Sequence, residues 1–237
     1  MNRYLDISKL LKRNSFFLFG PRGTGKSYLI RNTLLKESSS IDYIDLLNSR
    51  FFIQLQNDPT RLENLVSNKT VVIDEVQRIP EILNEVQRLM EERKIKFLLT
   101  GSSARKLRRN NTNLLAGRAY RAELFPLTWR ELKSSGVFDL GKYLKVGGLP
   151  KACADDEGFD FLYAYIDVYL KEEIQSEALA RNLIHYSRFL ESAAGMSSEM
   201  VNFTKVANDA QLSPNTVRDY YKILEDTLLG FLLPPWT

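Results

Sequence analysis

The sequence has 237 residues, of which 44% are hydrophobic and 26% charged, as in a folded globular protein. Its 33 basic and 29 acidic residues give a formal net charge of +4, a mildly basic balance that permits nucleic-acid contact without indicating it. The single cysteine, Cys153, excludes an intrachain disulfide, and the single histidine, His185, excludes a metal site built from several histidines.

No apolar run reaches the roughly 18 residues that a transmembrane helix needs. The N-terminus, MNRYLDISKLLKRN, mixes charged and apolar residues and lacks the uninterrupted apolar core of a signal peptide. We therefore expect a cytoplasmic protein with no membrane partner. The densest basic cluster fits a solvated loop better than a phosphate-contacting patch, and it consists of Arg105, Lys106, Arg108 and Arg109.

Short β-rich runs alternate with helical stretches in the first half of the chain. Four of them are residues 15–19 (SFFLF), 41–46 (IDYIDL), 70–73 (TVVI) and 96–100 (KFLLT), and residues 119–124 are a candidate fifth strand. Runs this short and apolar suit the strands of a parallel sheet that is covered on both faces. The alternation predicts a doubly wound α/β fold.

The helical signals divide the chain in two. In the first part, a helix begins after Gly25, and another spans residues 80–93 with Pro80 at its first helical position. After residues 147–150 (GGLP) every strong signal is helical, and an apolar stripe at helical spacing predicts the core of a helical subdomain. The stripe consists of Phe161, Leu162, Tyr165, Ile166, Tyr169, Leu170 and Ile174. We expect residues 1–155 to form the α/β domain and residues 156–237 the helical one.

Residues 20–27 (GPRGTGKS) have the pattern of a phosphate-binding loop: glycine, four residues, glycine, lysine and a hydroxyl residue. We expect its three glycines to adopt positive φ, so that the backbone curls and its N–H groups approach an anion. The following helix would point its partly positive N-terminus at the phosphates. Lys26 would reach the β- and γ-phosphates. The residues expected to bind ATP are Gly20, Pro21, Arg22, Gly23, Thr24, Gly25, Lys26, Ser27 and Tyr28.

Residues 71–75 (VVIDE) form an apolar strand that ends in two carboxylates. Because successive residues at a strand end point different ways, one carboxylate can serve a magnesium ion while the next orients a water molecule. Phosphoryl transfer needs both functions. We assign Asp74, with the hydroxyl of Ser27, to Mg²⁺ and Glu75 to the attacking water. A solvated acidic loop is the alternative.

Further candidates surround this pair. If the sheet has the P-loop order, residues 96–100 lie between the P-loop strand and the acidic strand, and Thr100 or Ser102 would contact the γ-phosphate or the water. Capping of the next helix is an equally good role for the hydroxyls after this strand. Arg118 is our first candidate, and Arg121 the second, for a guanidinium that stabilises the transferred phosphate, in cis or from a neighbouring subunit. A surface arginine is the alternative.

In chain order, the strings GPRGTGKS, VVIDEVQRIP, LLTGSSARKL, LLAGRAYRAELFPLTWREL and GGLP resemble a family of prokaryotic AAA+-like P-loop ATPases. The resemblance extends from about residue 15 to the end of the chain. It implies a sheet of order 5-1-4-3-2 and Mg²⁺-dependent ATP hydrolysis. It also implies that the end of the strand at Thr100 and Ser102 senses the nucleotide, and that Arg118 belongs to a Gly-Arg element. By the same resemblance, Gly148 and Pro150 lie in a loop that closes over the nucleotide.

Members of that family usually continue into a winged-helix segment and then a C-terminal domain that resembles restriction-endonuclease cores. This sequence stops at Thr237, so we expect a fragment or a truncated member that lacks the last domain. Residues 202–229 fit a helix-turn-helix, with Ser213 as N-cap and a first wing strand at residues 228–233.

The exposed start of the second of these helices is suited to contact DNA through Asn215, Thr216, Arg218 and Lys222. Acidic residues dilute the positive charge of the same helix, and winged-helix units in ATPases also serve as lids or oligomer contacts. The main hypothesis is therefore an AAA-type ATPase, able to form homo-oligomers, that relays its nucleotide state to a partner through a helical lid. A nucleotide-gated switch with little turnover and a DNA-binding regulator are the two other classes.

Overall fold

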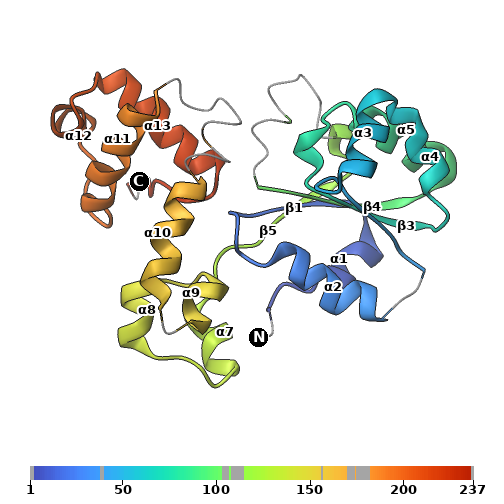
Figure 1. Ribbon diagram of the computed structural model, residues 1–237, viewed down its shortest axis with the longest axis horizontal. Coiled ribbons are helices and arrows are strands. Elements are labelled where there is room, and N and C mark those ends of the chain that lie inside the picture. The colour runs from blue at the N-terminus through green and yellow to red at the C-terminus, as the bar shows by residue number, and fades with distance from the viewer. Residues whose placement is uncertain are drawn as a thin grey trace. The chain divides into compact units, whose positions relative to one another are not determined.

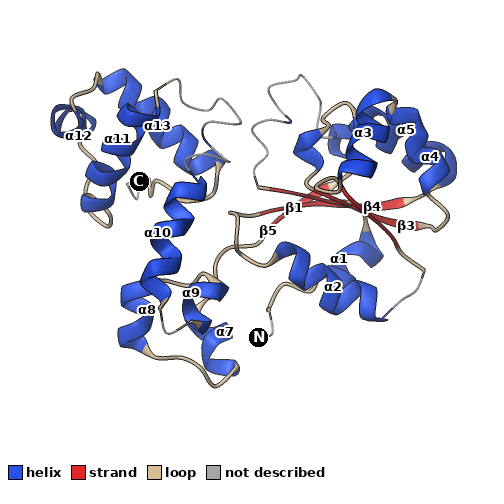
Figure 2. Cartoon of the chain, in the orientation of Figure 1, coloured by secondary structure: helices blue, strands red, loops and turns tan. Residues whose placement is uncertain are grey.

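The computed structural model describes residues 3–37, 40–102, 107, 115–155, 157–169, 174 and 182–235. It consists of two compact units, Met1–Asp156 and Glu157–Thr237. The first unit is built around a sheet, and the described part of the second unit is helical, as Figure 2 shows.

The sheet of the first unit has five parallel strands: β1 (Phe16–Phe19), β2 (Asp42–Asp45), β3 (Thr70–Asp74), β4 (Lys96–Gly101) and β5 (Tyr120–Glu123). Their order is β2-β3-β4-β1-β5, which confirms the expected order 5-1-4-3-2 read from the other edge. The central strands are apolar on both sides and fully buried, as parallel strands between helical layers are. All five predicted runs are strands.

Helices cover both faces of the sheet (Figure 1). The α1 helix (Ile7–Arg13) and α2 (Lys26–Glu37) lie on one face, and α3 (Ser49–Asn57), α4 (Leu62–Leu65) and α5 (Ile82–Arg93) lie on the other. Side chains alternate along β1, so that Phe16 and Leu18 pack with α1 and α2 while Phe17 stacks on Phe19, with ring centroids 5.4 Å apart. Three short 3₁₀ turns, η1 (Pro59–Arg61), η2 (Val76–Arg78) and η3 (Leu115–Gly117), connect these elements.

The start of α5 differs from the sequence prediction. The helix begins at Ile82, and Pro80 lies in the turn before it rather than at the first helical position. The N–H of Ile82 bonds to the carbonyl of Ile79, and the N–H of Leu83 bonds to that of Pro80, at 3.1 and 3.2 Å. These are three-residue spacings, so the chain winds more tightly before the α-helix forms.

The described part of the first unit also contains the short helices α7 (Trp129–Ser134), α8 (Leu140–Val146) and α9 (Pro150–Ala154). Thr128 and Glu131 form a capping box at the start of α7. The loop before α9 packs tightly against the loop before α7, since a β-carbon on Gly148 would lie 2.2 Å from the carbonyl oxygen of Leu127. The glycine is therefore required by close approach of two backbones.

The described part of the second unit contains α10 (Gly158–Val168), α11 (Leu183–Gly195), α12 (Phe203–Ala210) and α13 (Pro214–Asp226). The last three helices pack around aromatic rings: Tyr186 lies edge-on to Tyr220, and Phe189 edge-on to Tyr221, each pair at 5.0 Å between centroids. The predicted stripe enters this core through Tyr169 and Ile174. Ile166, however, is 49% exposed, and Leu170 lies outside the described residues.

The predicted wing strand at residues 228–233 is wrong, because this segment forms no strand. Leu228 has a positive φ of 59°. The N–H groups of Leu229 and Gly230 both bond to the carbonyl of Leu224, so the backbone curls back over the end of α13. In the described residues, α12 and α13 are thus joined by a short turn, and no β-wing follows them.

Candidate functional site

The phosphate-binding loop is curled between β1 and α2. Gly23 and Gly25 have φ of 80° and 89°, a conformation that favours glycine. The expectation of positive φ at Gly20 is wrong. Gly20 is required for another reason, since a β-carbon there would lie 2.3 Å from the carbonyl oxygen of Leu124. Arg22 and Gly23 are exposed at the turn of the loop, whereas Pro21 and Thr24 are buried.

Lys26 lies across this loop rather than in solvent. Only 6% of it is exposed, and its Nζ donates to the carbonyl oxygens of Gly20 and Pro21 at 2.7 and 3.2 Å. Thr24 Oγ1 donates to the same Pro21 carbonyl at 2.9 Å. The ammonium group is thus held inside the ring of backbone that a phosphate would occupy.

The helix α2 begins at the phosphate-binding loop, so the partly positive end of its dipole faces the loop. The first turn of the helix contains no acidic residue, and its N–H groups have no carbonyl ahead of them in the helix to bind. The N–H of Leu29 makes the first intrahelical bond, to Gly25 at 2.8 Å. The helix dipole at this end therefore favours an anion.

Asp74, at the end of β3, accepts hydrogen bonds from three hydroxyl groups. The Ser27 and Tyr43 hydroxyls donate to its Oδ2 at 2.7 and 2.6 Å, and Thr100 Oγ1 donates to its Oδ1. Asp74 itself is 2% exposed. The bond to Ser27 joins the phosphate-binding loop to the acidic strand, so the two residues that the sequence analysis assigned to Mg²⁺ lie side by side.

This oxygen set fits a magnesium ion. Mg²⁺ takes hard oxygen ligands and usually keeps several waters and substrate phosphates besides one or two protein oxygens. Ser27 Oγ and Asp74 Oδ2 supply two such oxygens beside the phosphate-binding loop. Across the described residues, no cluster of three or more His, Cys, Asp and Glu side chains is placed to hold a metal by itself, so the ion would depend on nucleotide and water.

Tyr43 is a site residue that the sequence reasoning missed. Strand register pairs it with Val72, so Asp74 lies two residues further along the neighbouring strand and on the same face. Burial, followed by the bond to Asp74, raises the pKa of the Tyr43 phenol far above its ordinary value. The phenol is therefore a permanent donor at physiological pH. Alternation in residues 41–46, read together with the strand order, could have revealed it.

Glu75 leaves the strand in a different direction from Asp74. It adopts left-handed backbone angles, φ 62° and ψ 44°, and its N–H donates to Thr100 Oγ1 at 3.1 Å. One of its carboxylate oxygens, Oε2, accepts from Gln77 Nε2 at 2.5 Å. Thr100 thus contacts both acidic residues, Asp74 through its hydroxyl hydrogen and Glu75 through its lone pair.

Ser102 follows β4 on the same side of the sheet. It is 5% exposed, and its hydroxyl makes no hydrogen bond to the described part of the protein. Residues 103–106 and 108–114 lie outside the described residues, and so does the basic cluster Arg105, Lys106, Arg108 and Arg109.

Arg118 lies at the opposite end of the strands from the phosphate-binding loop. It precedes β5, and parallel pairing of β1 with β5 aligns Tyr120 with Phe16, at the start of the P-loop strand. Its guanidinium pairs with Glu91 of α5 at 2.9 Å. Within its own subunit, Arg118 is thus engaged with α5, at the end of the strands away from the loop. Arg121 is also engaged elsewhere, with Glu123 at 2.6 Å.

Two other predicted residues lie beside the loop. A β-carbon on Gly25 would be 3.9 Å from Cγ of Pro150, so Pro150 lies next to the phosphate-binding loop within the first unit. Tyr28, one turn into α2, is 62% exposed. Cys153, in α9, donates from Sγ to the carbonyl of Gly147 at 3.1 Å, and burial raises the pKa of its thiol, which disfavours a nucleophilic role.

A buried ion pair, which the sequence did not reveal, is hydrogen-bonded to the backbone of the phosphate-binding loop. Arg3 and Glu131, each 7% exposed in the side chain, pair at 3.1 Å. Arg3 also donates to the carbonyls of Thr24 and Phe125 at 2.8 and 2.6 Å. Because Thr24 belongs to the phosphate-binding loop and Glu131 caps α7, the pair connects these two elements through the N-terminal segment.

In the second unit, the residues predicted to contact DNA lie on α13. Asn215, Arg218 and Lys222 are exposed, while Thr216 is half-buried and serves the helix cap through the Ser213 hydroxyl. Arg218 donates to Asn215 at 3.1 Å, and Lys222 pairs with an acidic neighbour at 3.4 Å. The positive groups of this face are thus partly engaged on their own helix.

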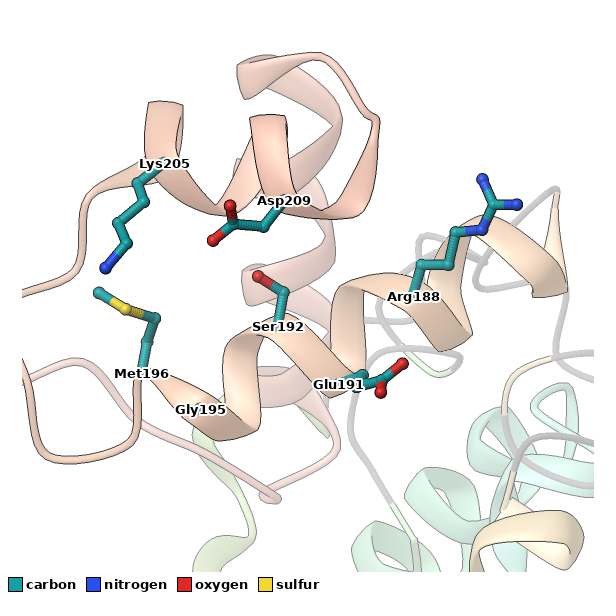
Figure 3. A pocket seen from close by; sticks show the side chains of 7 residues that line it. All are labelled: Arg188, Glu191, Ser192, Gly195, Met196, Lys205 and Asp209. Carbon is teal, nitrogen blue, oxygen red and sulfur yellow. The ribbon is translucent and has the colours of Figure 1, made fainter.

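An open groove of about 490 Å³ lies between α11 and α12 (Figure 3). Its charges are mixed, with two basic and two acidic side chains, so it does not select an ion of either sign. The lining residues are Arg188, Glu191, Ser192, Gly195, Met196, Lys205 and Asp209.

In the described part of the chain, no helix is long and apolar enough to span a membrane.

Comparison with known families assigns most of the chain. The family described as "AAA domain" matches residues 12–133. The chain belongs to this AAA-domain family. Residues 137–237 match a second family, described as a domain of unknown function. The C-terminal part is thus assigned to a domain of unknown function, and the matches include no restriction-endonuclease-like domain.

Among curated proteins, an uncharacterized protein of Methanocaldococcus jannaschii is 22% identical over 262 residues, which cover 98% of this chain and 59% of that protein. An uncharacterized protein of Mycobacterium tuberculosis is 28% identical over 225 residues, with 92% of this chain and 49% of that protein covered. The chain spans about half the length of these relatives.

Two solved structures are similar in fold. The ORC2 protein of Aeropyrum pernix, in ADPNP–ADP complexes, has a TM-score of 0.48 at 14% identity, covering 94% of this chain and 84% of that chain. The RuvB Holliday junction branch migration motor of Thermotoga maritima has a TM-score of 0.44 at 16% identity, with the same shares covered. At these identities the likeness concerns the fold alone.

Proposed function

We propose that this protein binds ATP with Mg²⁺ and hydrolyses it. The observation that carries the proposal is the 2.7 Å hydrogen bond between Ser27 of the phosphate-binding loop and Asp74 of the acidic strand, with Glu75 as the next residue. A phosphate seated in the loop would then have a cation site on one side and a carboxylate for a water molecule on the other. This pairing is what phosphoryl transfer to water requires.

Each residue has a distinct task in this proposal. The loop backbone and the N-terminus of α2 bind the phosphates, and Lys26 exchanges its two carbonyl partners for the β- and γ-phosphates. Ser27 and Asp74 hold Mg²⁺, which neutralises charge on the phosphates when bound. Glu75 orients water for in-line attack on the γ-phosphate. Thr100 holds both acidic residues in register through its single hydroxyl.

Two variants test the proposal. Lys26→Ala removes the cation that faces the phosphates, and we expect it to weaken ATP binding at least 100-fold, about 2.7 kcal/mol. Glu75→Gln keeps the size and polarity of the side chain, so we expect wild-type ATP binding and hydrolysis reduced on the order of 100-fold. Nucleotide titration and phosphate release under single-turnover conditions measure both quantities. Wild-type protein that binds ATP and releases no phosphate would instead indicate a nucleotide-gated switch.

The Gly148–Pro150 segment provides a route from the nucleotide to the rest of the protein in this proposal. Pro150 contacts the phosphate-binding loop at Gly25 and begins α9. A change in loop conformation on hydrolysis would therefore move the start of α9 and, through it, the helices that follow. Proteolysis of the protein with ATP, with ADP and without nucleotide measures this; identical cleavage in all three states would contradict the relay.

A second candidate function is DNA binding by the second unit. The observation that favours it is the helix-turn-helix geometry of α12 and α13, with Asn215, Arg218 and Lys222 exposed on α13. If Arg218 and Lys222 contact phosphates, each replacement by Ala should lower the salt slope of affinity by about 1. Lys205→Ala on α12 removes the same charge elsewhere and is the matched control. Equal slopes in all variants would exclude this face.

A further inference from the structure

The carboxylate of Glu75 is held by a buried glutamine from the turn that follows it. Gln77 Nε2 donates to Glu75 Oε2 at 2.5 Å. The two residues belong to the same tight turn, η2, in which the N–H of Arg78 bonds to the carbonyl of Glu75 at 3.0 Å. The bond therefore closes a small ring of backbone and side chain, which restricts the rotation of the Glu75 side chain.

Gln77 is itself fixed by packing. It is 5% exposed, and its Oε1 is so close to β4 that a β-carbon on Gly101 would lie 2.7 Å from it. The same Oε1 is buried without a hydrogen-bond partner in the described part of the chain. Burying an unpaired amide oxygen costs free energy, so a glutamine that served packing alone would be unfavourable here. The hydrogen bond that Nε2 donates to Glu75 gives the amide group a role.

The bond leaves Glu75 asymmetric. Oε2 is held by Gln77, whereas Oε1 accepts no hydrogen bond from the described residues. A carboxylate that positions a water molecule needs this arrangement, because one oxygen must be fixed to set the direction of the other. Glu75 lies in the left-handed region, so its backbone also departs from the strand at a defined angle.

We propose that Gln77 is a positioning residue for ATP hydrolysis: it holds Oε2 of Glu75 so that Oε1 is directed to the attacking water. The inference rests on the proposed function, because it assigns Glu75 to the water. Gln77 does not contact the nucleotide in this proposal and acts through Glu75. It should therefore affect turnover and leave the affinity for ATP unchanged.

The test compares two substitutions of this residue. Gln77→Met keeps the length and most of the volume and removes the donor, and Gln77→Asn keeps the amide and withdraws it by one methylene. We expect both to lower kcat on the order of 10-fold with KM and the affinity for ATP unchanged. The matched control is Gln87→Met, since Gln87 makes an exposed bond to Glu91 at 3.1 Å in α5, and we expect wild-type kcat there.

A double substitution separates positioning from general damage. If Gln77 acts only through the carboxylate of Glu75, adding Gln77→Met to Glu75→Gln should cause no further loss of turnover, whereas independent effects would multiply. Unchanged kcat in Gln77→Met, raised kcat, or a multiplicative loss in the double variant would each overturn the inference. Wild-type protein without ATPase activity would overturn the proposed function itself, so the two failures are distinguishable.

Folding of the variants is checked by the same nucleotide titration. ATP affinity equal to wild type shows an intact phosphate-binding loop, so a loss of kcat then reports on the water side of the site. If Gln77→Met loses ATP binding as well, Gln77→Asn provides the comparison because it retains a polar side chain of smaller volume. Loss of ATP binding in both variants would contradict a role confined to Glu75 and overturn the inference.

Discussion

Tyr43 and Asp74 are joined by a 2.6 Å hydrogen bond between neighbouring strands of the sheet. The phenol shares Oδ2 with the hydroxyl of Ser27, so the carboxylate that would hold Mg²⁺ is fixed from β2, from α2 and, through Thr100, from β4. A buried carboxylate needs this many donors because its charge is far from water. The position of this carboxylate is therefore fixed by three elements, β2, α2 and β4.

Tyr43→Phe removes one of these donors and keeps the ring. Since hydrogen bonds to charged groups contribute about 1.5–3 kcal/mol, we expect the free energy of unfolding to fall by about 1.5 kcal/mol in urea titrations. Tyr120→Phe, at a residue that is 56% exposed on β5, is the control and should change stability by less than about 0.5 kcal/mol. Equal stability of Tyr43→Phe and wild type would show that Ser27 and Thr100 suffice for Asp74.

Arg118 allows a test of catalysis between subunits. Arg118 precedes β5 and lies at the end of the strands away from its own phosphate-binding loop. A role of Arg118 in hydrolysis therefore requires that it reach the nucleotide site of a neighbouring copy. We expect Arg118→Ala and Lys26→Ala to be inactive separately, by on the order of 100-fold or more, and a mixture of the two to regain activity at sites that combine an intact Lys26 with an intact Arg118. Phosphate release as a function of mixing ratio measures this.

In the control experiment Arg121→Ala takes the place of Arg118→Ala, because Arg121 pairs with Glu123 within β5. A mixture with no more activity than its components would assign Arg118 to its ion pair with Glu91, a structural role in holding η3 to α5.

The sequence was sufficient for the sheet and the phosphate-binding loop because both depend on local signals. The strands β1, β3 and β4 are short apolar runs ended by glycine or acid, and the loop pattern fixes its own conformation through Gly23 and Gly25. Strand order came from the resemblance, and it placed Thr100 beside Asp74 correctly. Gly20 was misread since its constraint comes from Leu124, a residue distant in sequence.

The contacts between distant segments were not predictable in the same way. Tyr43 and Arg3 reach the site from strands and segments whose partners are set by register and packing, which no local pattern reveals. The prediction of a wing strand was wrong because the apolar residues after α13 resemble a strand in sequence. In the structure, the carbonyl of Leu224 accepts hydrogen bonds from two N–H groups of this segment, so the chain turns back. The position of Arg118 was also not predictable, because a Gly-Arg pattern does not say at which end of a strand the arginine lies.

The ion pair behind the loop predicts a pH dependence of stability. Burial opposes the ionised form of Glu131, but bonds from the N–H groups of Thr128 and Tyr4 and the charge of Arg3 outweigh it and lower the pKa of the carboxyl. A lowered pKa in the folded state contributes stability that is complete above the unfolded value of 4.5 and is lost as the pH falls through the folded value. Glu131→Gln should therefore have a shallower loss of stability on acidification than wild type.

Arg3→Ala tests the same pair from the other side. It leaves Glu131 buried without its cation and two backbone carbonyls without their donor, so we expect a loss of roughly 3 kcal/mol at neutral pH. Urea titrations between pH 3 and 7 measure both variants. Parallel stability curves for wild type and Glu131→Gln would mean that the carboxyl titrates alike in the folded and unfolded chain.

Gly148→Ala tests the backbone contact that places the Gly148–Pro150 segment against the phosphate-binding loop. Its β-carbon would lie 2.2 Å from the Leu127 carbonyl oxygen, and since both groups are backbone, neither can move without displacing the other loop. We expect a loss of at least about 3 kcal/mol in unfolding titrations, as for other severe steric changes. Gly195→Ala, in α11, meets no atom within 4 Å and should be neutral or stabilising by up to about 1 kcal/mol. Equal stability of the two variants would mean that the loop before α9 and the loop before α7 separate without cost.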